Sequence, residues 1–266
     1  MKISSNIYTF LYKKFENNSL CFLVNTRNFF KNLNTRIHFK ENLYVLEENN
    51  NKLFVKNKFR LKRIAEKGLR ARSNDLAEIY MLDSVNFEDG DNVVDVGANI
   101  GEIYFYFQLQ NIKIKYCTIE PSDTNETLIK SFPNAQHFKF ALSNKEKQKK
   151  FYLKENSGDN SLIKIKSPTK IVNINTKTLK FLEKYFTNIK LLKIDAEGGE
   201  PEILIVIKDL NIKINYISVD VGNERGLRKL DTSRRCDTIL KKFGYSKINE
   251  YRNQIRKVNL YKKNWI

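Results

Sequence analysis

Two stretches of the sequence combine apolar residues with acids and glycines. VVDVGANIG covers residues 93–101, and LLKIDAEGGE covers residues 191–200. Each has the pattern of a buried strand that runs into a polar turn, and in a parallel sheet ligands bind beyond the carboxyl ends of the strands. The two stretches therefore indicate either two sides of one binding crevice or two structural turns of an α/β scaffold.

The glycine spacing of the first stretch separates one class of cofactor from another. A dinucleotide site uses GxGxxG, whereas Gly97 and Gly101 are spaced GxxxG, with Asn99 between them and Asp95 before them. An acid here would repel a pyrophosphate but can hold an amine, so the loop suits S-adenosylmethionine better than NAD. Glu120 ends the next expected strand, where a carboxylate can accept both ribose hydroxyls. We therefore expect a methyl-donor site.

The second stretch supplies acids for the reaction. Asp195 and Glu197 follow its strand, and a carboxylate there can accept the proton of an attacking hydroxyl or orient that hydroxyl. Lys193 alternates with Asp195, so the two side chains share a face of the strand. We expect these three residues to be catalytic. For Glu200, directly before Pro201, the favoured role is to offset the dipole at a helix N-terminus.

A third acidic strand end lies in ISVDVGNERG, residues 217–226. Asp220 ends the expected strand, and Glu224 and Arg225 follow in the loop, where we expect them to bind polar groups of the substrate. A divalent metal shared by the acids of these strand ends is disfavoured because no histidine supports it. The two histidines, His38 and His137, are expected in core or surface roles elsewhere. We therefore expect no metal.

The elements that must position these residues alternate along the chain. Apolar runs predict strands at 92–96, 114–119, 136–141, 190–194 and 216–220. Helical patterns occur at 101–110, 123–130, 176–186, 201–208 and 232–243. This alternation predicts an α/β fold with a doubly wound, mostly parallel sheet and helices on both faces. Shorter β-like pieces at 150–153, 162–165 and 171–174 indicate an insertion or an edge hairpin.

Residues 1–60 are expected to form an N-terminal accessory extension and residues 61–266 the catalytic domain. Within the extension, 43–46 and 53–55 predict a hairpin. Its first 30 residues hold short apolar pieces interrupted by Lys, Glu and Asn, without the continuous core of a signal peptide. An extension that packs on the domain is favoured over an amphipathic membrane-surface helix, although the basic N-terminus allows peripheral membrane contact. No apolar run is long enough to predict a transmembrane segment.

The composition bounds the partners and the compartment. A net charge of +18, from 48 Lys+Arg against 30 Asp+Glu, attracts polyanions, but the basic residues are spread along the whole chain. Codon bias in an AT-rich genome explains the charge equally well. The three cysteines lie far apart, which argues against zinc-finger spacing and a disulfide framework. Free thiols suit a reducing cytosol, so we expect a cytoplasmic protein.

A family resemblance adds to this interpretation. In order and spacing, VVDVGANIGEIYFYF, TIEPSD, LLKIDAEGGEPEIL and ISVDVGNERG resemble the FkbM family of S-adenosylmethionine-dependent methyltransferases. The resemblance covers about residues 67–261, and KIDAEGGE is its most specific part. It departs from the family at Lys180, where an acid usually follows Thr-Leu.

The resemblance implies a Rossmann-like class I methyltransferase fold and methylation of a hydroxyl on a sugar, a glycan or another small molecule. It places Glu120 at the ribose, and Asp195 and Glu197 at the site of methyl transfer. The cofactor-binding residues expected with Glu120 are Asp95, Gly97, Ala98, Asn99, Gly101, Pro121, Ser122 and Leu142.

Other functions remain open from the sequence. An RNA 2′-O-methyltransferase is encouraged by the net charge and by Lys193, but a second well-placed lysine is not identifiable. Methylation of a base amine is disfavoured because the chain has no Pro-Pro sequence. A non-catalytic S-adenosylmethionine-binding module predicts lost glycines or acids in the cofactor loop, and these are intact. The expected acceptor is a hydroxyl-bearing small molecule or glycan, with nucleic acid disfavoured.

Overall fold

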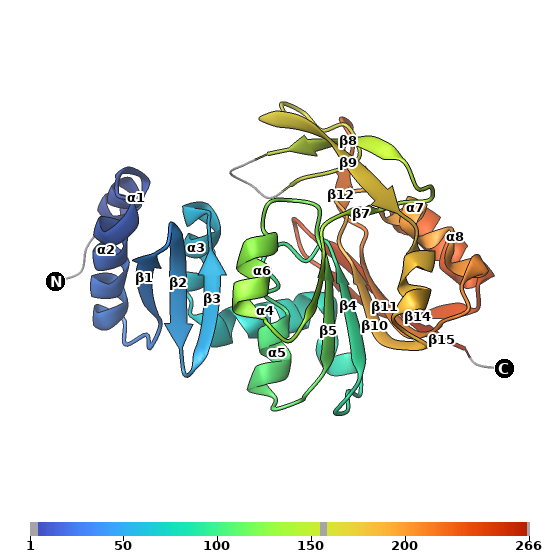
Figure 1. Cartoon of the computed structure of the whole chain (residues 1–266), viewed down its shortest axis with the longest axis horizontal. Coiled ribbons are helices and arrows are strands. Elements are labelled where there is room, and N and C mark those ends of the chain that lie inside the picture. The colour runs from blue at the N-terminus through green and yellow to red at the C-terminus, as the bar shows by residue number, and fades with distance from the viewer. Residues whose placement is uncertain (1–4, 155–158, 265–266) are drawn as a thin grey trace.

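The computed structural model describes residues 5–154 and 159–264. A seven-stranded sheet with the order β14-β15-β11-β10-β4-β5-β6 forms its centre (Figure 1). Its strands are β4 (Asn92–Val96), β5 (Lys115–Ile119), β6 (Gln136–Phe138), β10 (Asn188–Ile194), β11 (Lys213–Asp220), β14 (Tyr245–Arg252) and β15 (Lys257–Lys263). The five neighbouring strands β11, β10, β4, β5 and β6 pair in parallel, whereas β15 is antiparallel to both of its neighbours. The predicted mostly parallel sheet is confirmed.

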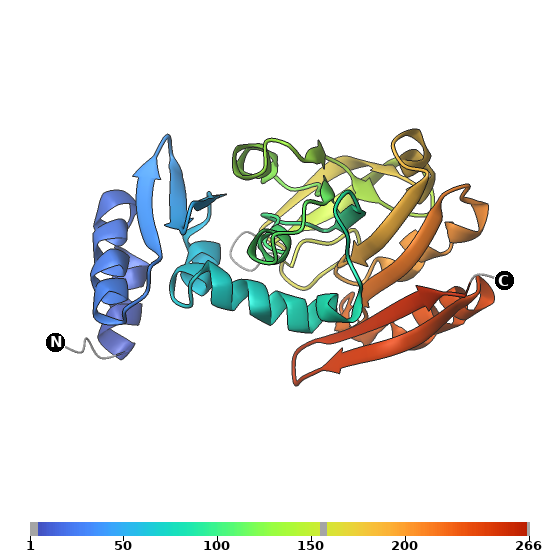
Figure 2. The same ribbon diagram turned by 90° about the horizontal axis from the view of Figure 1, so that it is seen from below.

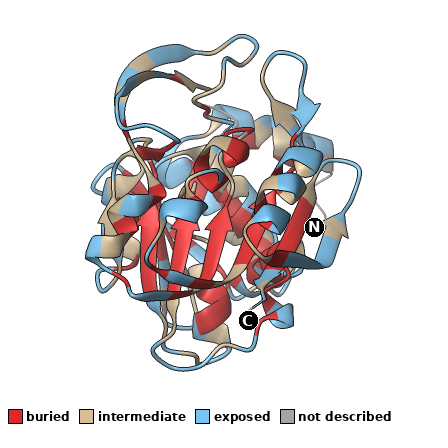
Figure 3. Ribbon diagram, turned by 90° about the vertical axis from the view of Figure 1, so that its right-hand side faces the viewer, coloured by how far each residue is buried: buried red, intermediate tan, exposed pale blue. Residues whose placement is uncertain are grey.

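Helices cover both faces of this sheet because successive residues of a buried strand point to opposite sides. Val93 of β4 packs in the core under α4 and α5, whereas Val94 packs in the core under α7 and α8. The covering helices are α4 (Leu69–Tyr80), α5 (Tyr104–Leu109), α6 (Asn125–Ser131), α7 (Glu200–Leu204) and α8 (Ser233–Lys242). Single 3₁₀ turns occur at η1 (Leu82–Ser84), η2 (Leu179–Lys184) and η3 (Ile207–Asp209). Figure 3 shows the buried strands lying between more exposed helices.

The N-terminal elements lie at one end of the molecule (Figures 1 and 2). They are α1 (Ser5–Lys14), α2 (Asn17–Phe30), the antiparallel strands β1 (Arg36–Lys40), β2 (Leu43–Glu48) and β3 (Asn51–Val55), and α3 (Lys58–Ala65). The predicted hairpin is β2–β3. Leu20, Leu46 and Leu53 belong to the same hydrophobic core as Val93. The division of the chain at residue 60 stays a prediction.

A second, smaller sheet lies above the carboxyl ends of the central strands (Figure 1). It consists of β7 (Ala141–Leu142), β8 (Gln148–Leu153) and β9 (Lys170–Lys177), in the order β7-β9-β8. A separate two-stranded hairpin is formed by β12 (Asn223–Arg225) and β13 (Leu230–Asp231). The antiparallel pair β8–β9 is the predicted insertion. In the described residues, no helix has the length and apolar character needed to cross a bilayer.

Three sequence-based predictions in this region are wrong. The expected strand 136–141 is split, because β6 ends at Phe138 and β7 leaves the central sheet to pair with β9. The piece 162–165 is irregular apart from a bridge between the preceding Ser161 and Tyr152. The expected helix 176–186 is β-structure up to Lys177, followed by the 3₁₀ turn η2. Leu179 and Leu182 are both buried at the three-residue spacing that a 3₁₀ turn aligns.

Candidate active site

A cavity of about 960 Å³, including its open mouth, lies beyond the carboxyl ends of β4, β5 and β10. The sheet order reverses between β4 and β10, so the loops after these two strands diverge and leave a crevice. Both glycine- and acid-containing stretches line it, at 95–99 and at 195–199. The structure therefore brings together the two strand ends that the sequence singled out.

The loop after β4 passes directly over the end of β10. Asp195 donates its backbone N–H to the carbonyl of Val96 at 3.0 Å. Gly97 has φ +70°, and a Cβ at this position would lie 1.8 Å from the main-chain oxygen of Asp195. Only glycine fits such an approach. Gly101 has φ +76°, and a Cβ there would lie 2.5 Å from the Phe132 ring. Both glycines are thus fixed by sterics.

Glu120 lies buried at the end of β5 and lines the cavity. Its two carboxylate oxygens accept backbone N–H groups from Asn99 at 2.8 Å and Ser122 at 2.9 Å. Each oxygen keeps a further lone pair, so the group can still accept hydroxyls of a ligand. Ala98, Asn99, Pro121 and Leu142 also line the cavity, whereas Ser122 lines an adjoining hollow.

Asp95 and Lys193 form a buried ion pair at 2.8 Å beneath the cavity. Tyr116 donates its hydroxyl to Asp95 at 2.6 Å, and Lys193 also donates to the carbonyl of Gly97 at 3.0 Å. Burial opposes the charge of Lys193, but the carboxylates of Asp95 and Asp195 raise its pKa above the ordinary value. Lys193 is therefore a fixed cation that ties β10 to the loop after β4.

Asp195 is held by two residues from distant parts of the chain. Its Oδ2 accepts the hydroxyl of Tyr80 at 2.7 Å and lies 3.4 Å from the guanidinium of Arg256. Its Oδ1 is buried and has no hydrogen-bond partner. Burial opposes ionisation, but Arg256 and Lys193 lower the pKa of Asp195. Asp195 is thus an oriented carboxylate with one oxygen left to accept a hydrogen bond.

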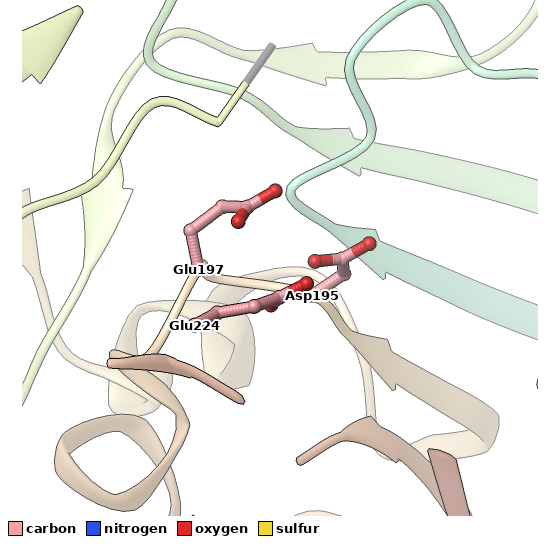
Figure 4. Close-up of side chains that lie close together, drawn as sticks. All are labelled: Asp195, Glu197 and Glu224. Carbon is pink, nitrogen blue, oxygen red and sulfur yellow. The ribbon is translucent and has the colours of Figure 1, made fainter. Parts of the chain in front are cut away.

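Three carboxyl groups converge at this point. Oxygens of Asp195, Glu197 and Glu224 lie within 4.8 Å of one another. Asp195 and Glu197 lie in the loop after β10, and Glu224 comes from β12 (Figure 4). Burial and the Asp195 carboxylate raise the pKa of Glu197 well above its ordinary value and that of Glu224 to about 11. Glu224 is therefore protonated at neutral pH, and burial favours the neutral form of Glu197. Carboxyl oxygens are also ligands of hard cations, and the expected absence of a metal stays a prediction.

The other acids near the cavity have structural partners. Asp220 is buried, lies 3.3 Å from Arg256 and accepts the N–H of Gly222 at 3.1 Å. Burial and Asp195 raise its pKa to about 7. Glu200 accepts the N–H groups of Ala196 and Gly198, both at 3.0 Å. These two N–H groups lie in the loop before α7, and burial raises the pKa of Glu200 to about 8, so the expected offset of the helix dipole by a carboxylate stays a prediction.

Arg225 does not join the cavity lining. Both of its terminal nitrogens bind Glu202 of α7, at 2.7 and 2.8 Å. A bidentate pair of this kind fixes the loop that carries Glu224. The structure thus groups Glu224 with Asp195 and Glu197 and turns Arg225 toward α7.

Several cavity residues were not identified from the sequence. Tyr80 ends α4, and Arg256 lies in the turn between β14 and β15. Arg72 of α4 pairs with Glu102 at 2.7 Å in a largely buried ion pair, and Arg60 of α3 also lines the cavity. No motif spacing marks these residues, because separate elements bring them to the site only in the folded chain.

Comparisons with known proteins give one family match. The model described as "Methyltransferase FkbM domain" matches residues 95–247, which include the cofactor loop and all three acidic strand ends. No curated protein matches the sequence at a significant level.

Solved structures with a similar arrangement are distant in sequence. A Pyrococcus horikoshii protein is 15% identical, with 90% of this chain and 81% of that chain covered and a TM-score of 0.46. TYW2 of the same organism, in complex with MeSAdo, is 14% identical over 91% and 81% of the two chains, with a TM-score of 0.44. TrmK of M. capricolum, in complex with S-adenosyl-homocysteine, is 14% identical over 73% and 68%, with a TM-score of 0.43. Likeness at this level carries no information about the reaction.

Proposed function

Because the chain belongs to the FkbM methyltransferase family, we propose that it transfers a methyl group to a hydroxyl of a sugar, a glycan or another small molecule. The fold is the Rossmann-like class I methyltransferase fold, with β15 inserted antiparallel beside β11. The cofactor is S-adenosylmethionine. Glu120 and Gly97 are considered below as partners of the cofactor, and Asp195, Glu197 and Glu224 as partners of the acceptor.

The residues that line the cavity suit S-adenosylmethionine in their chemistry. Glu120 keeps lone pairs for the ribose hydroxyls, and Gly97 removes the side chain that would fill the turn beside the methionine end. Phe140 and Leu142 add apolar surface for a flat base. When bound, the cofactor supplies an electrophilic methyl group on a sulfonium.

Asp195 carries the proposal for hydroxyl methylation. Its unpartnered Oδ1 can accept the hydrogen bond of an attacking hydroxyl, and its Oδ2 is fixed by Tyr80 and Arg256. The lowered pKa keeps Asp195 ionised but makes it a weak base. Alignment of the oxygen nucleophile therefore contributes more than proton abstraction. Formation of the C–O bond would break the bond between the methyl group and the sulfonium sulfur and leave a neutral thioether, and the hydroxyl proton would pass along Asp195 to solvent.

The acids beside Asp195 support an acceptor rich in hydroxyl groups. In the neutral form that burial favours, Glu197 and Glu224 can each donate one hydrogen bond and accept others. A sugar offers several adjacent hydroxyls that pair with such groups. A polyanionic acceptor would instead meet the Asp195 carboxylate and receive no compensating cation from Lys193, which Asp95 and main-chain carbonyls occupy.

The same contacts argue against the RNA 2′-O-methyltransferase alternative. That chemistry needs a lysine free to activate a ribose hydroxyl, whereas the pKa of Lys193 is raised by its carboxylate neighbours. A non-catalytic binding module is also disfavoured, because Asp195 is held with one oxygen unused. We further propose a cytoplasmic location, supported by the three buried free cysteines.

Transfer of a tritiated methyl group from S-adenosylmethionine tests the acceptor class. The purified protein is incubated in parallel with total RNA, with free and lipid-linked sugars, and with glycans. Label in a sugar or glycan fraction is the expected result, and label in RNA alone would overturn the proposal. No transfer to any fraction, with S-adenosylmethionine still bound in calorimetry, would favour the binding module.

The Asp195→Asn variant tests the role of the carboxylate. It should bind S-adenosylmethionine with nearly unchanged affinity, because Asp195 contacts the cofactor loop through its main chain. Turnover should fall by about 10²–10⁴, the range for loss of an acid–base or orienting group. Affinity is measured by calorimetry and turnover by label transfer, with Asp209→Asn at the distant turn η3 as the control. Unchanged turnover would assign the hydroxyl to another residue.

A further inference from the structure

The two N-terminal helices expose large apolar side chains on their outer surfaces. On α1, Ile7 is 56% exposed and Phe10 55%. On α2, Phe22 and Phe29 are each 73% exposed and Phe30 is 56% exposed. A lone exposed apolar residue needs no explanation, but five on two consecutive helices indicate an interaction surface.

On α2 the helical spacing turns the exposed phenylalanines away from the core. Phe22 and Phe29 are seven residues apart and therefore share one face of α2, while Leu20 and Val24 face the hydrophobic core. Phe29 and Phe30 contact each other edge to face, with ring centroids 5.6 Å apart.

The α1 helix repeats this two-sided arrangement. Tyr8 and Tyr12 are buried, whereas Ile7 and Phe10 lie three residues apart on the exposed side. Each helix thus uses one face to hold the fold and exposes apolar side chains on a second face.

Basic residues frame this apolar surface. Lys13 and Lys14 end α1, and the exposed Lys31 follows α2. The Lys14 ammonium lies 4.6 Å from the Phe10 ring centroid, so charge and apolar surface adjoin. The sequences of α1 and α2 contain no acidic residue. Glu16, between the helices, is bound to Lys58 at 3.0 Å.

We propose that α1 and α2 dock on an anionic lipid bilayer, with the phenylalanines inserted at the interface and the lysines at the headgroups. Interfacial helices combine these two features, and each basic residue near an anionic surface adds to binding. A second copy of the chain fits this surface less well, because two such faces would bring like charges together with no carboxylate to pair them. Docking goes beyond methyl transfer and does not depend on the acceptor.

The position of the helices leaves the cavity accessible in this arrangement. In Figures 1 and 2, α1 and α2 form one end of the molecule, and β14 and β15 lie at the other. Arg60 and Arg72, from α3 and α4, line the cavity between these ends. A bilayer against α1 and α2 would therefore contact the molecule beside the site and would not cover β10 or β4.

Co-sedimentation with vesicles tests the proposal. The full chain is mixed with vesicles of phosphatidylcholine alone and with vesicles of equal parts phosphatidylcholine and phosphatidylglycerol. Binding to the anionic vesicles is expected, with at least about tenfold weaker binding to the neutral ones. Equal binding to both, or binding to neither, would overturn it.

Two variants with matched controls assign the surface. Phe22→Ser with Phe29→Ser should weaken binding to anionic vesicles about tenfold or more, whereas Ile171→Ser with Ile248→Ser, 51% and 46% exposed in the wild type, should not. The double variant Lys13→Gln with Lys14→Gln should also weaken binding to anionic vesicles. Its control is Lys241→Gln with Lys242→Gln, in the last turn of α8, which should not weaken binding. If the control variants lost as much binding to anionic vesicles, the effect would come from the overall charge or hydrophobicity of the protein, and the proposal would be contradicted.

Light scattering separates the bilayer from a second copy. The wild type is expected to be monomeric without vesicles, and all variants should keep turnover on a water-soluble acceptor and their melting temperature. A dimer that Phe22→Ser with Phe29→Ser dissociates would mean that a second copy occupies the surface, which would overturn the assignment to lipid.

Discussion

At the scale of single residues, the carboxylates of the site lie close together and are paired with the cations of Arg256 and Lys193. Asp195 and Asp220 share the guanidinium of Arg256, and Asp95 is neutralised by Lys193. Burial and the Asp195 carboxylate raise the pKa of Glu197, which favours its neutral form. The crevice therefore holds several acids close together with little uncompensated negative charge, which keeps it compatible with a neutral polyol acceptor.

The role of Glu120 is tested by the Glu120→Ala variant. The substitution removes the acceptor of the Asn99 and Ser122 N–H groups and the expected partner of the ribose. Two charge-assisted hydrogen bonds suggest a loss of about 3 kcal/mol, or roughly a hundredfold in affinity for S-adenosylmethionine. Calorimetry measures it, with the exposed Glu126→Ala as the control. Equal affinities in the two variants would remove Glu120 from the cofactor site.

Metal dependence is a separate prediction at this scale. Turnover should be unchanged after treatment with EDTA, because Arg256 pairs with Asp195 and burial favours the neutral forms of Glu197 and Glu224. Turnover is measured before chelation, after chelation and after addition of Mg²⁺. A loss that Mg²⁺ restores would show that the trio of Asp195, Glu197 and Glu224 holds a cation, as its geometry allows.

At the scale of elements, the junction of β4 and β10 organises the site. The Gly97→Ala variant tests it, because the added Cβ would lie 1.8 Å from the carbonyl oxygen of Asp195 at a backbone φ of +70°. Strain and displacement of β10 should lower the free energy of unfolding by at least about 3 kcal/mol. Denaturant unfolding measures it, with Gly90→Ala as control, since Gly90 also has positive φ but open space around it. If both variants lost the same unfolding free energy, the loss would come from the positive φ alone and the contact between Gly97 and Asp195 would contribute nothing.

The sequence predicted the elements whose signals are local. Local residue types suffice to predict β4, β10 and the glycine turn at 97–101. A strand buried on both faces requires apolar residues, and positive φ favours glycine. The break after Phe138 and the turn η2 escaped prediction, because pairing with β9 overrides the local pattern. Tyr80 and Arg256 escaped for another reason. They reach Asp195 only through α4 and through the insertion of β15 beside β11.

At the scale of the whole molecule, one hydrophobic core runs from the N-terminal helices to the central sheet. Tyr12 and Leu53 belong to the same cluster as Phe107 and Leu260. The cofactor loop therefore rests on a body that includes the elements before residue 60. We expect unfolding to be cooperative across this body, so that titration of one buried group changes the stability of all of it.

The pH dependence of stability provides a test through Glu200. Burial raises the pKa of this carboxyl from 4.5 to about 8, so the folded chain binds its proton more tightly than the unfolded chain does. The contribution is complete below pH 4.5 and is lost as the pH rises to about 8. Glu200→Gln, which keeps an oxygen for the Ala196 and Gly198 N–H groups, should flatten the fall in unfolding free energy over this window. Glu126→Gln should retain the wild-type slope.

The contact between Gly97 and the carbonyl of Asp195 also bears on how such enzymes diversify. The loop after β4 and the end of β10 cannot shift independently, so an altered acceptor preference is not expected to arise by moving one against the other. Variation should instead accumulate in the β8–β9 pair and the β12–β13 hairpin, which belong to separate small sheets. Libraries that randomise these segments and leave 95–101 and 193–200 intact should yield new acceptors without loss of cofactor binding.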